Sequence, residues 1–179
     1  MPGDGGSRGV LVLSGISAAG KSTVAQALAE RLDRSVHVRG DFFRRMIVNG
    51  QVNMTADPEP EALEQLRLRH RLAAASADAY CQAGFTAIIQ DILLGEHLQE
   101  ITETIKSRPL AVGVLAPSPD AVLAREEKRA KTGYGPDWQP KGLETVLRGS
   151  TPEVGLWLDT SDQTVDEILK RAWTESAVS

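Results

Sequence analysis

Residues Gly15–Ser22 of this 179-residue chain read Gly-Ile-Ser-Ala-Ala-Gly-Lys-Ser, and they are its most informative segment. It matches the pattern G-x-x-x-x-G-K-[ST] at every fixed position. The continuous apolar run Gly9–Leu13 before it predicts a buried strand, and residues Ser22–Leu32 after it have the apolar spacing of a helix. This pattern between a strand and a helix indicates a phosphate-binding loop, or P-loop, rather than a chance glycine-rich turn.

In such a loop, successive backbone N–H groups turn inward and bind phosphate oxygens, and the N-terminus of the next helix adds partial positive charge. Lys21 is expected to reach the β- and γ-phosphates of ATP, and the hydroxyl of Ser22 is expected to be a ligand of Mg²⁺. The predicted cofactors are therefore ATP and Mg²⁺. The residues predicted to bind them are Gly15, Ser17, Ala18, Ala19, Gly20, Lys21, Ser22 and Thr23.

Short apolar runs alternate with longer amphipathic segments along the rest of the chain. Further strands are predicted over Ser35–Val38, Phe85–Ile89, Leu110–Leu115 and Val154–Leu158, and further helices from Asp41, over Pro60–Ala83, over Asp120–Lys131 and over Thr164–Trp173. Five apolar strands alternating with helices predict an α/β fold of the P-loop NTPase type, with three layers (α/β/α) around a five-stranded parallel sheet. Ligands of such sheets bind at the carboxyl ends of the strands. The residues at those ends are Gly15, Asp41, Asp91, Ala116 and Asp159.

Asp41 follows the second predicted strand and is expected to be the N-cap of the next helix. Arg44 lies three residues later and would share a helical face with it. A carboxylate beside a guanidinium stays ionised and can accept a hydroxyl proton, while the arginine holds an anion. Asp41 is therefore predicted to be the general base, with Arg44 beside it. The alternative is a cap with a structural role alone.

Asp91 ends the third apolar strand, where an acidic residue can hold the hydration shell of Mg²⁺ opposite Ser22. A strand-terminal aspartate that caps the next turn is the structural alternative. Gln90, next to it, is a candidate hydrogen-bond partner of the substrate.

Arginines near the predicted crevice are candidates for binding anions. Arg125 and Arg129 are spaced i, i+4 just before the Gly/Pro-rich stretch Thr132–Lys141. The lid predicted over about 129–141 would bring positive charge to the phosphates and exclude water. Arg67 and Arg71 share one face of the long helix and could bind an anionic substrate group or lie on a solvated face. Four apolar residues could line a substrate pocket or belong to the core: Phe42, Phe43, Met46 and Met54.

Together these segments resemble the chloramphenicol phosphotransferase group of the nucleotide-kinase-like P-loop proteins. The resemblance covers nearly the whole chain and rests on Gly15–Thr23, the Asp41 segment, Ile88–Gly95, Arg125–Arg129 and Leu156–Thr160. It implies transfer of the ATP γ-phosphate to a hydroxyl of a small molecule. It also implies that Asp41 is the catalytic base, that Arg125 and Arg129 are lid arginines, and that residues after Asp159 form the adenine-side loop. The third strand of this family tends to end in Asp-Glu, where this chain has Gln90-Asp91.

Composition and charge narrow the class further. The formal net charge is −4 and the pI is about 5.4, which disfavours nucleic acid as a partner. No apolar stretch approaches the ~18 residues of a membrane span, so no membrane partner is expected. The single cysteine, Cys81, suits a reducing cytoplasm, and the three histidines lack zinc-ligand spacing. Residues 1–9 are predicted to be a flexible tail without a signal peptide, and residues 10–179 to be one P-loop kinase domain.

The predicted function is that of a kinase that phosphorylates a hydroxyl of an antibiotic or another natural-product-like small molecule. One alternative is a nucleotide or polynucleotide 5′-kinase, because Asp41-x-x-Arg44 after a P-loop also resembles the 5′-kinase domain of polynucleotide kinases. The other is a non-catalytic ATP-binding switch protein, although the chain lacks room for the extra helical domain of AAA-type motors. A homodimer is compatible with all three.

Overall fold

The computed structural model describes residues 8–128, 140–168 and 170. Within these residues the strands are β1 (Val10–Ser14), β2 (Ser35–Arg39), β3 (Thr86–Gln90), β4 (Leu110–Leu115) and β5 (Leu156–Leu158). The helices are α1 (Lys21–Ala29), α2 (Gly40–Arg45), α3 (Pro60–Gln82), α4 (Glu96–Thr104), α5 (Pro119–Glu127) and α6 (Pro140–Gly149). Residues 165–168 form a further helical turn.

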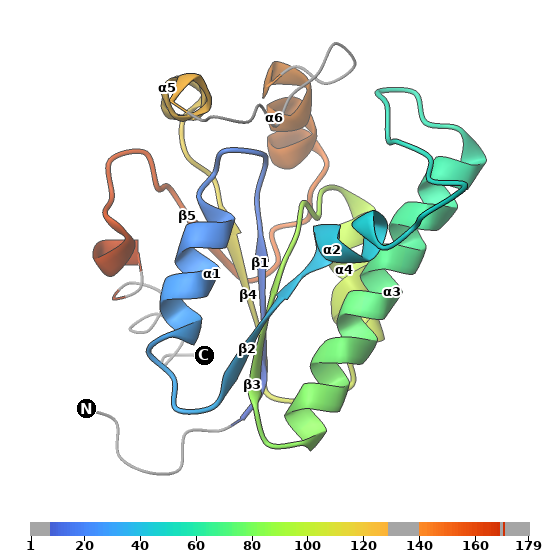
Figure 1. Cartoon of the computed structure of the whole chain (residues 1–179). Helices are drawn as coiled ribbons and strands as arrows, with labels where there is room; N and C mark the ends of the chain where they lie inside the picture. The colour runs from blue at the N-terminus through green and yellow to red at the C-terminus, as the bar shows by residue number, and fades with distance from the viewer. Residues whose placement is uncertain (1–7, 129–139, 169, 171–179) are drawn as a thin grey trace.

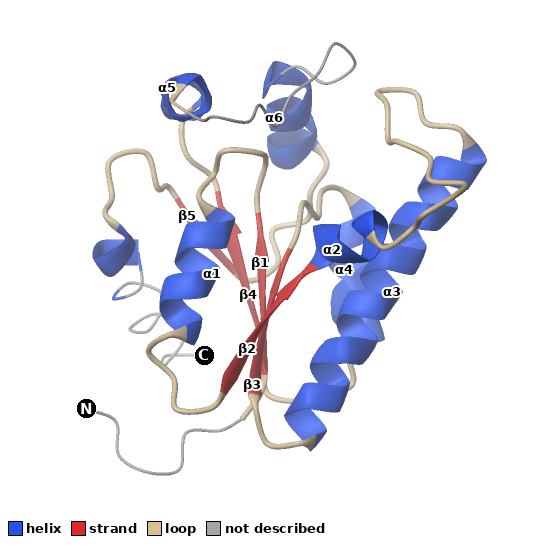
Figure 2. Cartoon of the chain, in the orientation of Figure 1, coloured by secondary structure: helices blue, strands red, loops and turns tan. Residues whose placement is uncertain are grey.

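The five strands form one parallel sheet in the order β2-β3-β1-β4-β5, which places β1 at the centre. Helix α1 covers one face of the sheet, and α3 and α4 cover the other, as Figures 1 and 2 show. Helices α5 and α6 lie beyond the carboxyl ends of the strands, at the top of Figure 1. The predicted three-layer α/β fold of the P-loop type is confirmed.

The core lies on both faces of the sheet because its central strands are apolar on both sides. Val12, Ile88, Ile89 and Val114 have no exposed surface, and burying each side chain of this size contributes about 1.5–3 kcal/mol. Alanines form the buried stripe of α3, at Ala62, Ala73, Ala74 and Ala77. Their small side chains let this 23-residue helix approach the sheet closely, which fixes its rotation about its own axis.

The start of α2 differs from the prediction. Arg39 is the N-cap of this helix and Gly40 is its first residue, so Asp41 lies in the first turn and is not the cap. A negatively charged side chain in the first turn still lies close to the positive end of the helix, where it is stabilising. The predicted N-cap was wrong by two positions, because the helix begins at Gly40, directly after the strand.

Two helices, α4 and α6, were not predicted, although both are amphipathic. Leu98, Ile101 and Ile105 follow helical spacing and bury one side of α4 and its end, and Leu143 and Leu147 do the same for α6. The predicted lid over 129–141 lies outside the described residues apart from its last two, as do most of the predicted tail and the end of the predicted closing helix. Among the described residues, no helix combines the length and apolar character that crossing a membrane requires.

The buried His70 of α3 makes stability depend on pH. Neither ring nitrogen has a hydrogen-bond partner among the described residues, and burial, with the nearby Arg69 and His97, lowers the pKa of His70 from 6.5 to about 3. Below pH 6.5 the imidazole of His70 binds a proton in the unfolded chain, whereas in the folded chain it binds one only near pH 3. Folding stability therefore decreases as pH falls through this window. The slope is at most about 1.4 kcal/mol per pH unit.

We expect His70→Leu to flatten this dependence, because leucine neither titrates nor leaves buried nitrogens unpaired. Urea denaturation of both proteins between pH 7 and pH 4 measures the effect. Equal slopes for the two proteins would show that His70 does not titrate as described.

Candidate active site

The segment from Gly15 to Gly20 turns from the end of β1 into α1 with three residues at positive φ. These are Gly15 (142°), Ala18 (60°) and Gly20 (96°). Gly15 is required by space as well as by conformation, because a Cβ atom there would lie 2.5 Å from the carbonyl oxygen of Leu115 on β4. The loop is thus pressed against the neighbouring strand, with the N-terminus of α1 directly behind it. This is the geometry in which backbone N–H groups bind an anion.

Lys21 is the first residue of α1 and is 7% exposed. Its ammonium group donates a hydrogen bond of 2.7 Å to the carbonyl oxygen of Ile16, so the side chain folds back over the loop. An ammonium group has three donors, and this position suits the binding of phosphate oxygens within the same loop. The loop and the lysine therefore form one site for phosphate groups. Ser22 and Thr23 follow on α1 and are exposed.

The hydroxyl of Ser22 donates a hydrogen bond of 2.9 Å to Oε1 of Gln90, the last residue of β3. Gln90 therefore occupies the place beside Ser22 that was predicted for Asp91. Side chains of successive strand residues point to opposite faces of a sheet, so Gln90 faces α1 and the next residue faces α3. A hydroxyl and an amide oxygen are hard oxygen ligands that suit Mg²⁺ or its bound water. Ser22 and Gln90 thus fit Mg²⁺, with Gln90 in the supporting position.

Asp91 lies on the other face of the sheet and binds an arginine of α3. Its carboxylate forms a two-pronged ion pair with Arg69, in which Nε donates to Oδ2 at 2.6 Å and Nη2 donates to Oδ1. The side chains are 2% and 14% exposed, and Asp91 also accepts a bond from the backbone N–H of Ile92. The structure therefore does not bring Asp91 together with Ser22. The prediction that they share a metal is not supported by this arrangement, because the charge of Asp91 is already compensated by Arg69.

Gly40 has no side chain and therefore leaves room for the ion pair between Asp91 and Arg69. A Cβ atom on Gly40 would lie 2.6 Å from the Asp91 carboxyl carbon and closer still to Oδ2. We expect Gly40→Ala to push Asp91 away from Arg69 and to lower the free energy of unfolding by about 3 kcal/mol, as breaking a buried pair does. Gly142→Ala on α6 is the matched control, because nothing lies within 4 Å of its Cβ position. Thermal and urea denaturation measure both variants, and equal stability of Gly40→Ala and Gly142→Ala would contradict the expectation.

Asp41 is held by the next turn of its own helix. Its Oδ2 binds Nη2 of Arg45 at 2.6 Å, whereas Arg44 donates instead to Oδ1 of Asn53 at 2.7 Å. The partner of Asp41 is thus the residue at i+4, and the predicted pairing with Arg44 is not formed. The other carboxylate oxygen, Oδ1, is buried and accepts no hydrogen bond within the described residues. Asp41 therefore combines one oriented oxygen with one unsatisfied oxygen at the carboxyl edge of the sheet.

Arg125 of α5 connects the P-loop to the segment after β5. Its guanidinium donates to the carbonyl oxygens of Ala19 at 3.4 Å and Ser161 at 3.2 Å, and also to that of Thr160. This places Arg125 on the β4–β5 side of the P-loop, opposite to Asp41 on the β2–β3 side. Arg129, the other predicted lid arginine, lies outside the described residues.

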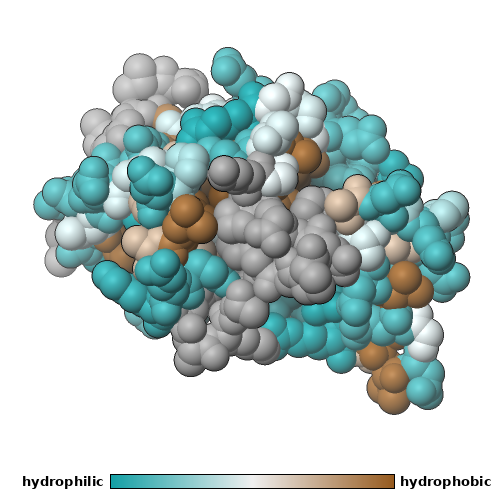
Figure 3. Space-filling view, turned by 90° about the horizontal axis from the view of Figure 1, so that it is seen from above, coloured by the Kyte–Doolittle hydropathy of each residue, from teal (hydrophilic) through white to brown (hydrophobic). Residues whose placement is uncertain are grey.

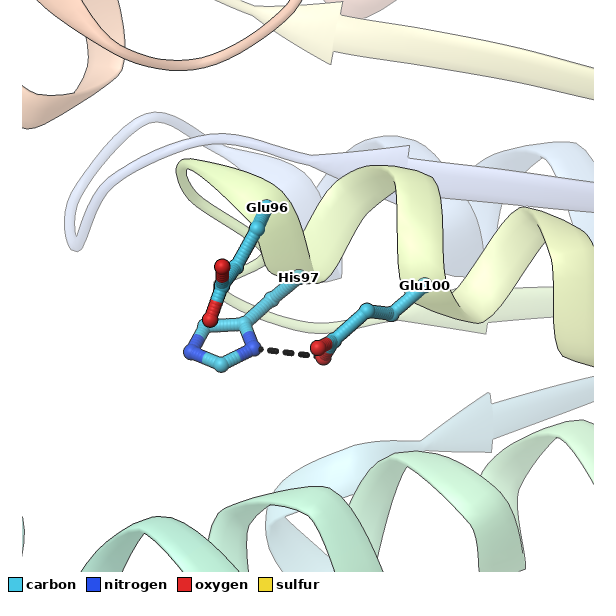
Figure 4. A group of neighbouring side chains, drawn as sticks. All are labelled: Glu96, His97 and Glu100. Atoms are coloured by element: carbon cyan, nitrogen blue, oxygen red, sulfur yellow. Dashed lines mark hydrogen bonds and ion pairs between the residues drawn. The ribbon is translucent and has the colours of Figure 1, made fainter.

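The arginines at the outer side of α3 lie away from the P-loop. Arg67 forms ion pairs with Glu96 (3.0 Å) and Glu100 (3.5 Å) of α4, and Arg71 lines a cavity of about 330 Å³ between α3 and α4. Glu96, His97 and Glu100 project to one side of α4 (Figure 4), with His97 hydrogen-bonded to Glu100 at 2.9 Å. The guanidinium of Arg67 already binds both carboxylates, so we assign no metal ion to this cluster.

The four apolar candidates divide between surface and core. Phe42 and Met46 are 48% and 71% exposed, while Phe43 packs against the core and Met54 is half-buried. Figure 3 views the molecule from above relative to Figure 1, and hydrophilic residues cover most of the described surface there. Two guanidinium groups approach the ring of Phe42: the central carbon of Arg39 is 4.8 Å from the ring centroid and that of Arg45 is 5.9 Å from it.

A family model described as an AAA domain matches residues 10–147, which span β1 to α6. The chain belongs to this AAA-domain family. No curated protein matches the sequence. The matched residues of the AAA domain include the P-loop, Asp41, Gln90 and Arg125, so the site described above lies inside it.

Solved structures share the architecture of this AAA domain. A sugar kinase from Janibacter sp. HTCC2649 superposes with a TM-score of 0.70 at 20% identity, covering 93% of both chains. The tunicamycin resistance protein of Deinococcus radiodurans gives 0.67 at 12% identity, covering 94% of this chain and 95% of the other. The APS kinase CysC of Mycobacterium tuberculosis, in complex with AMPPNP and APS, gives 0.63 at 16%, covering 94% and 96%. At these identities the likeness establishes a P-loop kinase-like fold.

Proposed function

We propose that this chain is a kinase that transfers the γ-phosphoryl group of ATP to a hydroxyl group of a small molecule of the antibiotic or natural-product type. The observation that carries the proposal is the unsatisfied oxygen of Asp41. A buried carboxylate oxygen without a donor is costly unless a ligand supplies one, and this oxygen lies at the sheet edge that also holds the P-loop. The kinase folds above support the reaction class, and the tunicamycin resistance protein supports the acceptor type.

The proposed reaction follows from these positions. The acceptor hydroxyl donates a hydrogen bond to Oδ1 of Asp41, and its oxygen attacks the γ-phosphorus of ATP. The bond between that phosphorus and the bridging oxygen of ADP breaks, and the hydroxyl proton passes to Asp41. Arg45 holds the other carboxylate oxygen, which fixes the orientation of the base.

The remaining residues bind and neutralise the nucleotide. The loop N–H groups and Lys21 would hold the phosphates, and Ser22, supported by Gln90, would hold Mg²⁺. Bound Mg²⁺ supplies positive charge to the phosphates of ATP. Arg125 would fix the loops on the nucleotide side, and Arg129 would add charge from the lid segment, as the sequence predicts.

Two experiments test the proposal. Calorimetry with ATP or GTP in the presence of magnesium tests nucleotide binding, and ADP release is then measured over a panel of acceptors: chloramphenicol, D-gluconate, shikimate, adenosine and a short 5′-hydroxyl oligonucleotide. Acceptor-stimulated ADP release with a small molecule supports the proposal. Stimulation by the oligonucleotide or adenosine alone favours a 5′-kinase. Nucleotide binding without stimulated release favours a switch protein, and no binding of either nucleotide removes the basis of all three.

A further inference from the structure

Positive charge is concentrated at the acceptor side of the site, although the chain as a whole is acidic. Four arginines and two carboxylates lie around the carboxyl ends of β2 and β3 and around helix α2. These charged residues are Arg39, Arg44, Arg45 and Arg69 with Asp41 and Asp91. The surplus is local, since the net charge of the whole chain is −4.

Both carboxylates already have partners. Arg45 binds Asp41 and Arg69 binds Asp91. Arg44 contacts only a neutral oxygen, that of Asn53, and no ion pair of Arg44 or Arg39 is formed within residues 8–128 or 140–168. Among the described residues, the charges of this cluster without an ion-pair partner are therefore those of Arg39 and Arg44.

Arg39 lies at the end of β2, in register with Gln90 of β3, and it stacks on Phe42. Its Nε is buried and has no hydrogen-bond partner within the described residues. A buried guanidinium nitrogen without an acceptor is unfavourable unless a ligand provides one. This is a second donor at the acceptor side that the protein itself leaves unsatisfied.

The charge of Arg44 affects the pKa of the buried Arg69. The pKa of Arg69 is lowered to about 10, chiefly by burial; the charge of Asp41 opposes this change and the charge of Arg44 adds to it. Like charges that repel across a partly buried site create a positive potential, and this potential attracts an anion.

The loop after α2 holds Arg44 in place. Gln65 of α3 accepts a bond from the backbone N–H of Val52 at 2.9 Å and donates to the carbonyl oxygen of Gly50 at 2.7 Å. These two bonds fix the loop that carries Asn53, and Asn53 in turn orients Arg44. A guanidinium held in this way loses little entropy when it binds a carboxylate or phosphate through two parallel bonds.

We infer that the acceptor carries an anionic group, a carboxylate or a phosphate, that binds Arg44 while the acceptor hydroxyl lies at Asp41. The inference rests on the proposed function, because it describes the acceptor of that reaction. Arg39 adds a second positive charge for the same ligand. An acceptor without an anionic group would leave both arginines unmatched.

Calorimetry on the protein saturated with AMPPNP and Mg²⁺ tests the inference, since the phosphate site is then filled. D-gluconate is compared with D-glucose, and 3′-AMP with adenosine, at constant ionic strength. The first pair probes a carboxylate and the second a phosphate. We expect the anionic member of at least one pair to bind at least about tenfold more tightly, because hydrogen bonds to charged groups contribute about 1.5–3 kcal/mol. Arg44→Gln should remove this preference, and Arg44→Lys should restore part of it.

Arg71→Gln is the matched control, because it removes one arginine of α3 that lines the cavity facing α4. It should leave the preference unchanged. Equal binding of charged and neutral members, no binding of either anionic compound, or a preference that survives Arg44→Gln would overturn the inference and leave the kinase proposal standing. Failure of AMPPNP itself to bind would instead remove the proposed function. Circular dichroism checks that each variant is folded.

Discussion

Lys21→Ala is expected to abolish nucleotide-dependent turnover, with a loss of about 100- to 1,000-fold or more in kcat/KM. Removal of one charged donor from a preorganised site commonly costs this much in the transition state. Lys21 is buried inside the P-loop and held 2.7 Å from the carbonyl oxygen of Ile16, so water cannot replace its charge efficiently. Calorimetry should also show weaker binding of ATP, because the lysine would contact the phosphates of the bound nucleotide before reaction.

Lys106→Ala provides the control for this variant. Lys106 follows α4 and is exposed, so its substitution removes the same charge at a position distant in sequence from the P-loop. Lys21→Met keeps most of the apolar stem and separates loss of charge from loss of packing. If Lys21→Ala retained full turnover while folded, the loop would not be the nucleotide site.

Asp41→Asn is expected to lower kcat by about 100- to 10,000-fold, the range for loss of a general base. Asparagine has nearly the same shape but cannot accept the hydroxyl proton at neutral pH. ATP affinity should change by less than about threefold, since Asp41 lies in the first turn of α2 and would contact the acceptor rather than the nucleotide. Steady-state ADP release and calorimetry on the same preparations separate these two effects.

Asp166→Asn is the matched control, because Asp166 forms an exposed ion pair with Arg31 and is distant in sequence from the site. A switch protein would show the same behaviour before and after the Asp41→Asn change. Equal turnover for the two variants would therefore exclude Asp41 as the base.

The parts of the site that lie within one local motif could be predicted from the sequence. The P-loop depends on residues next to one another, and its glycines and lysine have their roles within eight positions. The strands could also be predicted, because fully apolar runs bounded by polar residues have few alternatives. Leu110–Leu115 coincides with β4, Ser35–Val38 differs from β2 by one residue at one end, and Phe85–Ile89 is shifted from β3 by one residue at both ends.

The parts that depend on which face a side chain occupies could not be predicted as well. Gln90 and Asp91 are adjacent, and a one-residue uncertainty at the end of β3 exchanges their faces. Arg69 was overlooked in favour of Arg67 and Arg71 because only the rotation of α3 decides which arginine meets the sheet. A signal was present, since Arg69 lies four and eight residues before the buried Ala73 and Ala77 and therefore shares their stripe.

Because β1 is the central strand, it separates the residues of β2 and β3 from those of β4 and β5. Residues on β2, β3 and the helices between them would form the acceptor side, and residues after β4 and β5 hold the P-loop from the other side through Arg125. Substitutions between Arg39 and Arg69 could thus alter which compound is chosen without disturbing the energy source of the reaction. Such a separation would let new substrate preferences evolve on an unchanged nucleotide-binding half.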